Sequence, residues 1–224
     1  MEELSLIQRL AVLVLPVVLA ITVHEAAHGY VADRLGDRTA RMLGRVTLNP
    51  LKHIDPLGTV LLPLGMYALT GFLFGWAKPV PVNPRNLRSP RRDMAIVAAA
   101  GPLSNLVMAL LWSMAMLAGV SLLPVSAWVA APLVFTGAAG VLINVVLLVL
   151  NMIPLPPLDG GRVLVGVLPR GLARLVARIE PYGLFILVAL LVSGALGRFV
   201  TPFIDHIIRL LPGGAQYVLP IFFS

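Results

Sequence analysis

The sequence contains no cysteine and few charged residues, and both deficits narrow what the chain can be. Without cysteine there are no thiolate metal ligands, disulfide bonds or cysteine nucleophiles. Charged residues make up 12% of the 224 residues and hydrophobic residues 58%, whereas soluble domains have about 25% charged residues. The mean hydropathy is correspondingly high, at +0.93. This composition is that of a polytopic membrane protein.

Several apolar stretches approach the length that a bilayer core requires, about 20 residues. The clear candidates are Ser5 to Ala32, Met94 to Leu122, Ala127 to Met152 and Tyr182 to Leu196. A fifth stretch, Leu57 to Trp76, is interrupted by proline and glycine and has basic clusters on both sides. A re-entrant segment would keep both clusters on one side of the membrane, whereas an ordinary span would separate them against the positive-inside tendency. Both interpretations stay open.

We therefore expect an all-α polytopic membrane protein with about four to six transmembrane helices. No polar stretch is long enough for a separate soluble domain, so one membrane-embedded domain is expected over residues 1–224. Its core should span about residues 5–165, followed by C-terminal helices over about 166–224. Residues 40–50 and 77–84 resemble short strand-like pieces, with plain loops as the alternative.

The net charge of +7 comes from basic residues in short loops between apolar segments. Such residues normally orient membrane proteins, so we expect no nucleic-acid partner. If the basic loops lie on the cytoplasmic side, the N-terminus lies on the outer side of the membrane, and the first helix runs from there toward the cytoplasm.

The first apolar stretch carries the motif His24-Glu25-Ala26-Ala27-His28. Side chains four positions apart share one face of a helix, so His24 and His28 can bind one metal ion together. Glu25 lies beside them, within reach of a water molecule at that metal. Ionisable groups are costly within a membrane, and this pattern therefore predicts a functional site typical of zinc peptidases.

A catalytic zinc site usually has three protein ligands, so a third must come from elsewhere in the chain. Asp159 is the one acidic residue that directly follows a long apolar helix, after a segment that three prolines keep from being helical. Gly160 and Gly161 permit a close backbone approach at this point. The alternative is that Asp159 simply caps the next helix.

These motifs together resemble the site-2 protease family of intramembrane zinc metalloproteases, peptidase family M50. The resemblance also includes Ala100-Gly101-Pro102-Leu103-Ser104-Asn105, and it covers roughly residues 18–165. The stretches that match compact prokaryotic members are Gly44-Arg45-Val46-Thr47-Leu48-Asn49-Pro50 and Gly75-Trp76-Ala77-Lys78-Pro79-Val80-Pro81-Val82-Asn83-Pro84. The sequence has room for neither a PDZ domain nor a pair of CBS domains, so regulation through such domains does not carry over.

The resemblance implies one Zn²⁺ per chain, held by His24, His28 and Asp159, with Glu25 as the catalytic acid and base. It further suggests Asn151 for substrate or oxyanion contact, while Asn105 more plausibly ties helices together around the site. The implied activity is an endopeptidase that cuts transmembrane protein substrates in or near the lipid bilayer, as regulated intramembrane proteolysis or as clearance of signal-peptide remnants. A prokaryotic plasma membrane with the site toward the cytoplasm is the implied location. The oligomeric state is not indicated.

Two other functions compete with this interpretation: a metal-ion transporter and a non-enzymatic metal-binding scaffold. Transporters usually need a relay of polar groups along a path, whereas here the acidic candidates cluster at one depth. A non-enzymatic scaffold does not need a catalytic acid and base, so it would be expected to lose Glu25 before it loses its fold. His53 and His206 lie in a polar loop and an amphipathic tail, and we expect neither to bind the metal.

Overall fold

The computed structural model describes residues 5–61 and 78–222 of the chain. Three long helices dominate it: α1 (Leu6–Arg34), α4 (Pro90–Leu122) and α5 (Ala127–Asn151). Each is long and apolar enough to cross a membrane. The first three predicted spans are therefore confirmed, with ends that shift by a few residues.

Local sequence explains where two of these helices begin. Ser5 and Gln8 form a reciprocal capping box at the start of α1, which satisfies backbone N–H groups that have no partner within the helix. The helix α4 starts at Pro90, whose fixed φ suits the first helical position. The Asp93 carboxylate then accepts a hydrogen bond from the Ser89 N–H at 2.7 Å.

The helix α4 lies at the centre of the structure and packs against α1, α5 and α6 (Asp159–Val167). Small residues allow α5 to approach it closely. A Cβ atom on Gly137 would lie 2.7 Å from the Cβ of Met116, and one on Gly140 would lie 2.3 Å from the Trp112 ring. Close contacts at small residues are how helices associate in lipid, where apolar surface gives little driving force.

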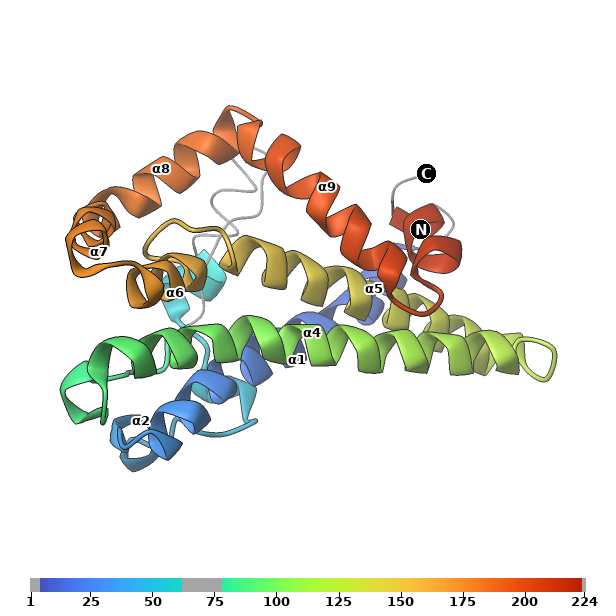
Figure 1. Ribbon diagram of the computed structural model, residues 1–224. Coiled ribbons are helices and arrows are strands. Elements are labelled where there is room, and N and C mark those ends of the chain that lie inside the picture. Colours follow the sequence, from blue (N-terminus) through green and yellow to red (C-terminus); the bar gives the residue numbers. More distant parts are fainter. Residues whose placement is uncertain (1–4, 62–77, 223–224) are drawn as a thin grey trace.

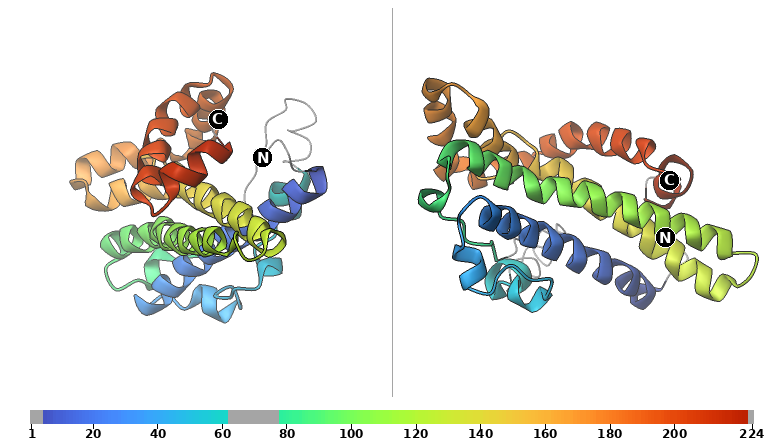
Figure 2. Two further views of the ribbon diagram at one scale, coloured as in Figure 1. Left: turned by 90° about the vertical axis from the view of Figure 1, so that its right-hand side faces the viewer. Right: turned by 60° about the horizontal axis from the view of Figure 1, so that its bottom comes forward.

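The C-terminal helices form a bent chain across the long helices: α7 (Arg170–Ala177), α8 (Glu180–Val192) and α9 (Ala195–Leu210), followed by the short α10 (Leu219–Phe222). They lie on the opposite side of α4 from α2 (Thr39–Met42), as both figures show (Figures 1 and 2). The buried core joins α4 and α5 to α9 through residues such as Met116, Val141 and Ile204.

The predicted span from Tyr182 to Leu196 is not one helix. The helix α8 ends at Val192, and Gly194 then adopts a left-handed conformation with φ 71° that stops the helix before α9 begins. With 13 residues, α8 is too short to cross alone. Together with α7, from which it is bent by 60°, it forms a candidate fourth span within the described residues.

The strand-like pieces predicted at 40–50 and 77–84 are absent, because the described residues contain no β-strand. The first piece instead holds most of α2 and the start of the 3₁₀ turn Pro50–Lys52. Further short turns lie at Pro56–Leu61, Pro84–Asn86 and Gly214–Val218. Most of the predicted re-entrant stretch, Leu57 to Trp76, lies outside the described residues.

Candidate metal centre

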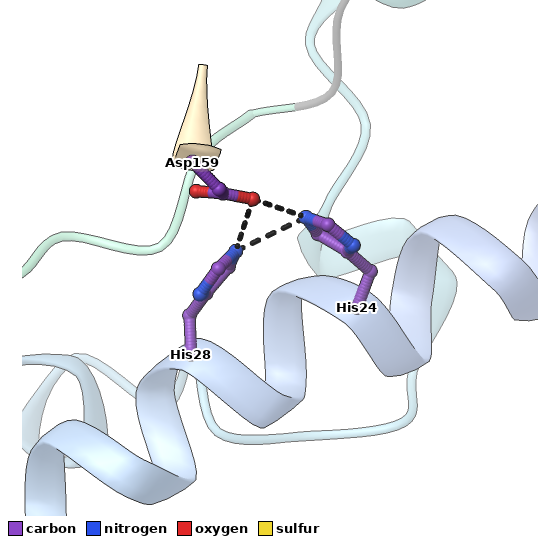
Figure 3. A group of neighbouring side chains, drawn as sticks. All are labelled: His24, His28 and Asp159. Atoms are coloured by element: carbon purple, nitrogen blue, oxygen red, sulfur yellow. Dashed lines mark hydrogen bonds and ion pairs between the residues drawn. The ribbon is translucent and has the colours of Figure 1, made fainter. Parts of the chain in front are cut away.

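Three side chains converge where α1 meets the start of α6, and Figure 3 shows their polar atoms facing one another. His24 and His28 come from successive turns of α1, and their Nε2 atoms lie 3.0 Å apart. Oδ2 of Asp159 lies 3.2 Å from Nε2 of His24 and 3.3 Å from Nε2 of His28. Among the described residues, this is the only group of three or more side chains arranged to hold a metal ion.

Hydrogen bonds fix which nitrogen of each imidazole carries its proton. Nδ1 of His28 lies 2.7 Å from the backbone oxygen of Val97, and Nδ1 of His24 lies 2.6 Å from Oδ1 of Asn105. Both oxygens can only accept, so each Nδ1 donates, and each Nε2 is left with a lone pair. A metal-binding histidine typically has its second nitrogen held in this way.

The orientation of Asn105 is itself fixed by its other contacts. Its amide nitrogen donates to the backbone oxygen of Ala20 at 3.3 Å and to Oδ1 of Asn144 at 2.9 Å. Asn144 in turn donates to the backbone oxygen of Gly140 at 2.8 Å. Both asparagines are fully buried, so this chain of hydrogen bonds from α5 through α4 sets the ring of His24. Asn105 therefore contacts both α1 and α5, whereas nothing in the sequence indicated the contact with Asn144.

The donor atoms fit a small divalent cation. Oδ2 of Asp159 is buried and accepts no hydrogen bond. The Nε2 atoms of His24 and His28 lie near it, but each presents a lone pair and has no proton to donate. A single proton could bridge two of these three atoms. The third atom would still face a lone pair, whereas a cation would satisfy all three. Two imidazole nitrogens and a carboxylate oxygen are a donor set that zinc accepts, and neighbouring ligands of a tetrahedral zinc are about 3.3 Å apart.

The backbone of α4 forms one wall of this cluster at Gly101. A Cβ atom there would lie 2.4 Å from Nε2 of His28 and 2.6 Å from Nε2 of His24. Only a residue without a side chain leaves this space to the imidazoles. The sequence offered Gly101 as part of a motif, but nothing in the sequence indicated that it faces the two histidines.

Asp159 reaches the cluster because α5 ends at Asn151 and the following proline-rich segment turns the chain. The first turn of α6 packs directly on this segment. A Cβ atom on Gly160 would lie 2.3 Å from the Met152 oxygen, and one on Gly161 would lie 2.2 Å from the Pro156 nitrogen. The two glycines thus permit the close approach predicted from the sequence.

Glu25 does not belong to the three-residue group. Its Oε2 accepts a hydrogen bond from the backbone N–H of Val80 at 2.7 Å. Val80 lies in the segment Lys78–Asn83, which is held at both ends: the Arg45 guanidinium donates to the Lys78 oxygen at 2.8 Å, and the Asn83 N–H donates to Asp37 at 2.6 Å. Nothing in the amino-acid sequence indicated this hydrogen bond between Glu25 and Val80.

Asp37, in the loop that follows α1, accepts hydrogen bonds from the end of this segment at Asn83 and from Asn86 beyond it. Burial alone would raise the pKa of its carboxyl group, but hydrogen bonds from Thr39, from Asn86 and from the Asn83 backbone outweigh burial and lower the pKa below its ordinary value. The ionised carboxylate therefore fixes the end of the segment that contacts Glu25.

The remaining candidate residues lie apart from the cluster. The Asn151 amide donates to the Leu147 oxygen of its own helix at 3.0 Å. The buried His53 ring contacts the Thr47 oxygen at 3.0 Å, and His206 is exposed on α9. Neither histidine belongs to the group of possible metal ligands among the described residues.

Comparison with known proteins agrees with this geometry. The model of the family "Peptidase family M50" matches residues 113–194, a range that contains Asp159. A Bacillus subtilis protein named "Putative zinc metalloprotease YwhC" is 36% identical, over 94% of this chain and 90% of its own length. The chain belongs to peptidase family M50. It is therefore an integral membrane protein and a zinc metalloendopeptidase of the site-2 protease type.

More distant M50 relatives are longer than this chain. The Rip2 protein of Mycolicibacterium smegmatis, also named as a zinc metalloprotease, is 34% identical over 81% of this chain and 66% of its own length. Rip2 of Mycobacterium tuberculosis is 31% identical over 79% of this chain and 65% of its own length. No solved structure matches the chain.

Proposed function

We propose that this M50 protein hydrolyses peptide bonds within or near the transmembrane segments of membrane proteins, with His24, His28 and Asp159 holding the zinc. The observation that carries the proposal is the convergence of three lone-pair donor atoms, 3.0 to 3.3 Å apart, between α1 and α6. Two of the three residues, His24 and His28, lie on a helix long enough to cross the membrane, so the substrates are proteins that reach this depth.

Bound zinc supplies a Lewis acid that polarises the scissile carbonyl and makes a water molecule nucleophilic near neutral pH. We assign to Glu25 the transfer of a proton from the attacking water to the leaving amine. Its Oε2 is occupied by the Val80 N–H, so Oε1 is the atom that would hold the water.

We place Asn105 as a positioning residue that acts through His24 rather than on the substrate. Asn151 stays a candidate for contact with substrate or oxyanion, because its amide uses one N–H on the Leu147 oxygen and has a second to offer. We further propose that the cleaved proteins are single-pass proteins or signal-peptide remnants, and that the site opens toward the cytoplasm of a prokaryotic cell. The basic loops predicted to lie inside support this orientation.

The test is elemental analysis of the purified protein and of four variants. We expect about one zinc per chain in wild type and in Glu25→Gln, and much less in His24→Ala and Asp159→Ala. His206→Ala is the matched control, since it removes an exposed histidine outside the cluster, and it should retain zinc. A folded wild-type protein without zinc after reconstitution would contradict the proposed site.

The role of Glu25 is tested by cleavage of tagged single-pass reporter proteins that are co-expressed with the enzyme. Glu25→Gln should slow cleavage by about 100-fold or more while zinc stays bound. Turnover at the wild-type rate in this variant would remove Glu25 from the mechanism and leave the metal site standing.

A further inference from the structure

The helix α7 has two chemically distinct faces. Arg170 and Arg174 are four residues apart and share one side of the helix. The opposite side carries Leu172 and Leu175, both of which are exposed. A helix with one basic and one apolar face lies in the plane of a membrane surface, with the apolar face in the acyl chains.

A cavity of about 400 Å³ lies on the basic side of α7, where α7 meets α4 and α6. It is lined by Arg91, Val165, Arg170, Ala173, Arg174 and Ala177. Arg91 is held in place because its Nε donates to the Val165 oxygen at 3.1 Å. The lining is almost wholly apolar, because the three arginines contribute mainly the carbon atoms of their side chains to it. Arg170 and Arg174 are otherwise exposed, so their charges lie beside the cavity.

These three arginines have no counter-ion in the part of the chain that the structure describes. The ion pairs found there join Arg41 to Asp33, Arg209 to Asp205, and the two cluster histidines to Asp159. Like charges gathered beside one cavity repel one another, so an anion next to these arginines would be bound favourably.

The position of Arg91 sets the depth of the cavity in the membrane. Arg91 is the second residue of α4, which has 33 residues and is therefore about 50 Å long, against about 30 Å for the hydrocarbon core. The charged residues that begin α4 thus lie at the level of the lipid headgroups. The exposed apolar stripe of α7 lies beside them, next to the acyl chains.

We propose that an anionic phospholipid binds here, with its phosphate headgroup beside Arg91, Arg170 and Arg174 and an acyl chain in the apolar cavity. Basic pockets beside membrane-spanning helices are suited to such headgroups. The apolar walls Val165, Ala173 and Ala177 suit an attached acyl chain, which a free phosphate ion lacks. The proposal does not depend on the peptidase activity.

The experiment uses the full chain, purified in detergent and stripped of lipid, with native mass spectrometry to count bound lipids. The probes are phosphatidylglycerol, phosphatidylcholine and inorganic phosphate. We expect wild type to bind phosphatidylglycerol about tenfold more tightly than phosphatidylcholine. Arg170→Gln/Arg174→Gln should weaken phosphatidylglycerol binding to about the phosphatidylcholine level.

The matched control is Arg92→Gln/Arg162→Gln, which removes the same charge from α4 and α6 at exposed positions that do not line the cavity. It should change phosphatidylglycerol binding less than about twofold. Arg170→Lys/Arg174→Lys keeps the charge and should retain most of the binding, which separates loss of charge from misfolding.

Three results would overturn the proposal. Equal losses in both Gln double variants would mean that diffuse surface charge attracts the lipid. Equal affinity of wild type for the two lipids would mean that the cavity does not recognise an anionic headgroup. Displacement of phosphatidylglycerol by an equal concentration of inorganic phosphate would assign the cavity to a free anion instead of a lipid.

Discussion

At the scale of single residues, some side chains of the metal cluster can be predicted from the sequence, whereas others that hold it in place cannot. The spacing of His24 and His28 predicts a shared helix face, and Asp159 is recognisable because it follows a long apolar helix and three prolines. Asn144 gives no comparable signal, because one amide in an apolar helix is equally consistent with simple packing. Its contact with Asn105 depends on how α4 and α5 pack, which spacing alone does not specify.

Gly101→Ala should remove zinc from the site without harming the helix that carries it. The added Cβ atom would lie within 2.6 Å of both Nε2 atoms, whereas alanine is a better helix former than glycine by about 1 kcal/mol. We expect zinc content to fall well below one per chain while the helical circular dichroism signal is kept.

Gly197→Ala in α9 is the matched control, because a Cβ atom there meets nothing within 4 Å. It should keep full zinc content. Normal zinc content in Gly101→Ala would mean that the imidazoles can move away from α4 at little cost.

At the scale of elements, hydropathy predicts α1, α4 and α5 well, because length and apolar content decide whether a segment can cross lipid. The same measure joins α8 to α9, since it does not detect the helix end at Gly194, which depends on backbone conformation. Hydropathy also does not show whether an extended segment, such as the piece predicted at 77–84, pairs with another strand. Arg45 and Glu25 take up backbone groups of Lys78 and Val80 that a strand partner would otherwise use.

One contact between elements connects the C-terminal helices to the metal cluster. A Cβ atom on Gly183 of α8 would lie 1.7 Å from the Pro156 oxygen, in the segment that leads to Asp159. Gly183→Val should therefore push α8 away from this segment, lower the free energy of unfolding by about 1–3 kcal/mol and reduce zinc content. Thermal unfolding in detergent and elemental analysis measure the two effects.

Gly197→Val supplies the comparison, because it adds the same side chain in open space. If both valine variants unfold at the same temperature and bind the same amount of zinc, α8 can shift freely and the contact has no structural importance.

At the scale of the whole molecule, the described residues contain three helices able to cross the membrane, or four if α7 and α8 act as one span. The proposed ligands come from the first of these helices and from the helix that follows the third. A metal bound to them therefore contributes to the stability of the entire fold, because it binds the folded chain and not the unfolded one.

Removal of zinc by a chelator should lower the melting temperature of the wild-type protein, and added zinc should restore it. At a free zinc concentration about 1,000 times the dissociation constant, the stabilisation is about 4 kcal/mol. Asp159→Ala, which lacks one ligand, should melt at the same temperature with and without chelator. An unchanged melting temperature in chelator-treated wild type, with zinc removal verified, would show that the folded state does not depend on the metal.

The distance along the chain between His28 and Asp159 also affects when the enzyme can become active during synthesis. The two residues are brought together only after α4 and α5 have been made and the proline-rich segment has turned the chain. An unfinished chain that ends before position 159 has both histidines and Glu25 but lacks the third of the proposed ligands. On the proposed ligand set, the nascent protein therefore cannot complete its metal site until most of the chain has been made.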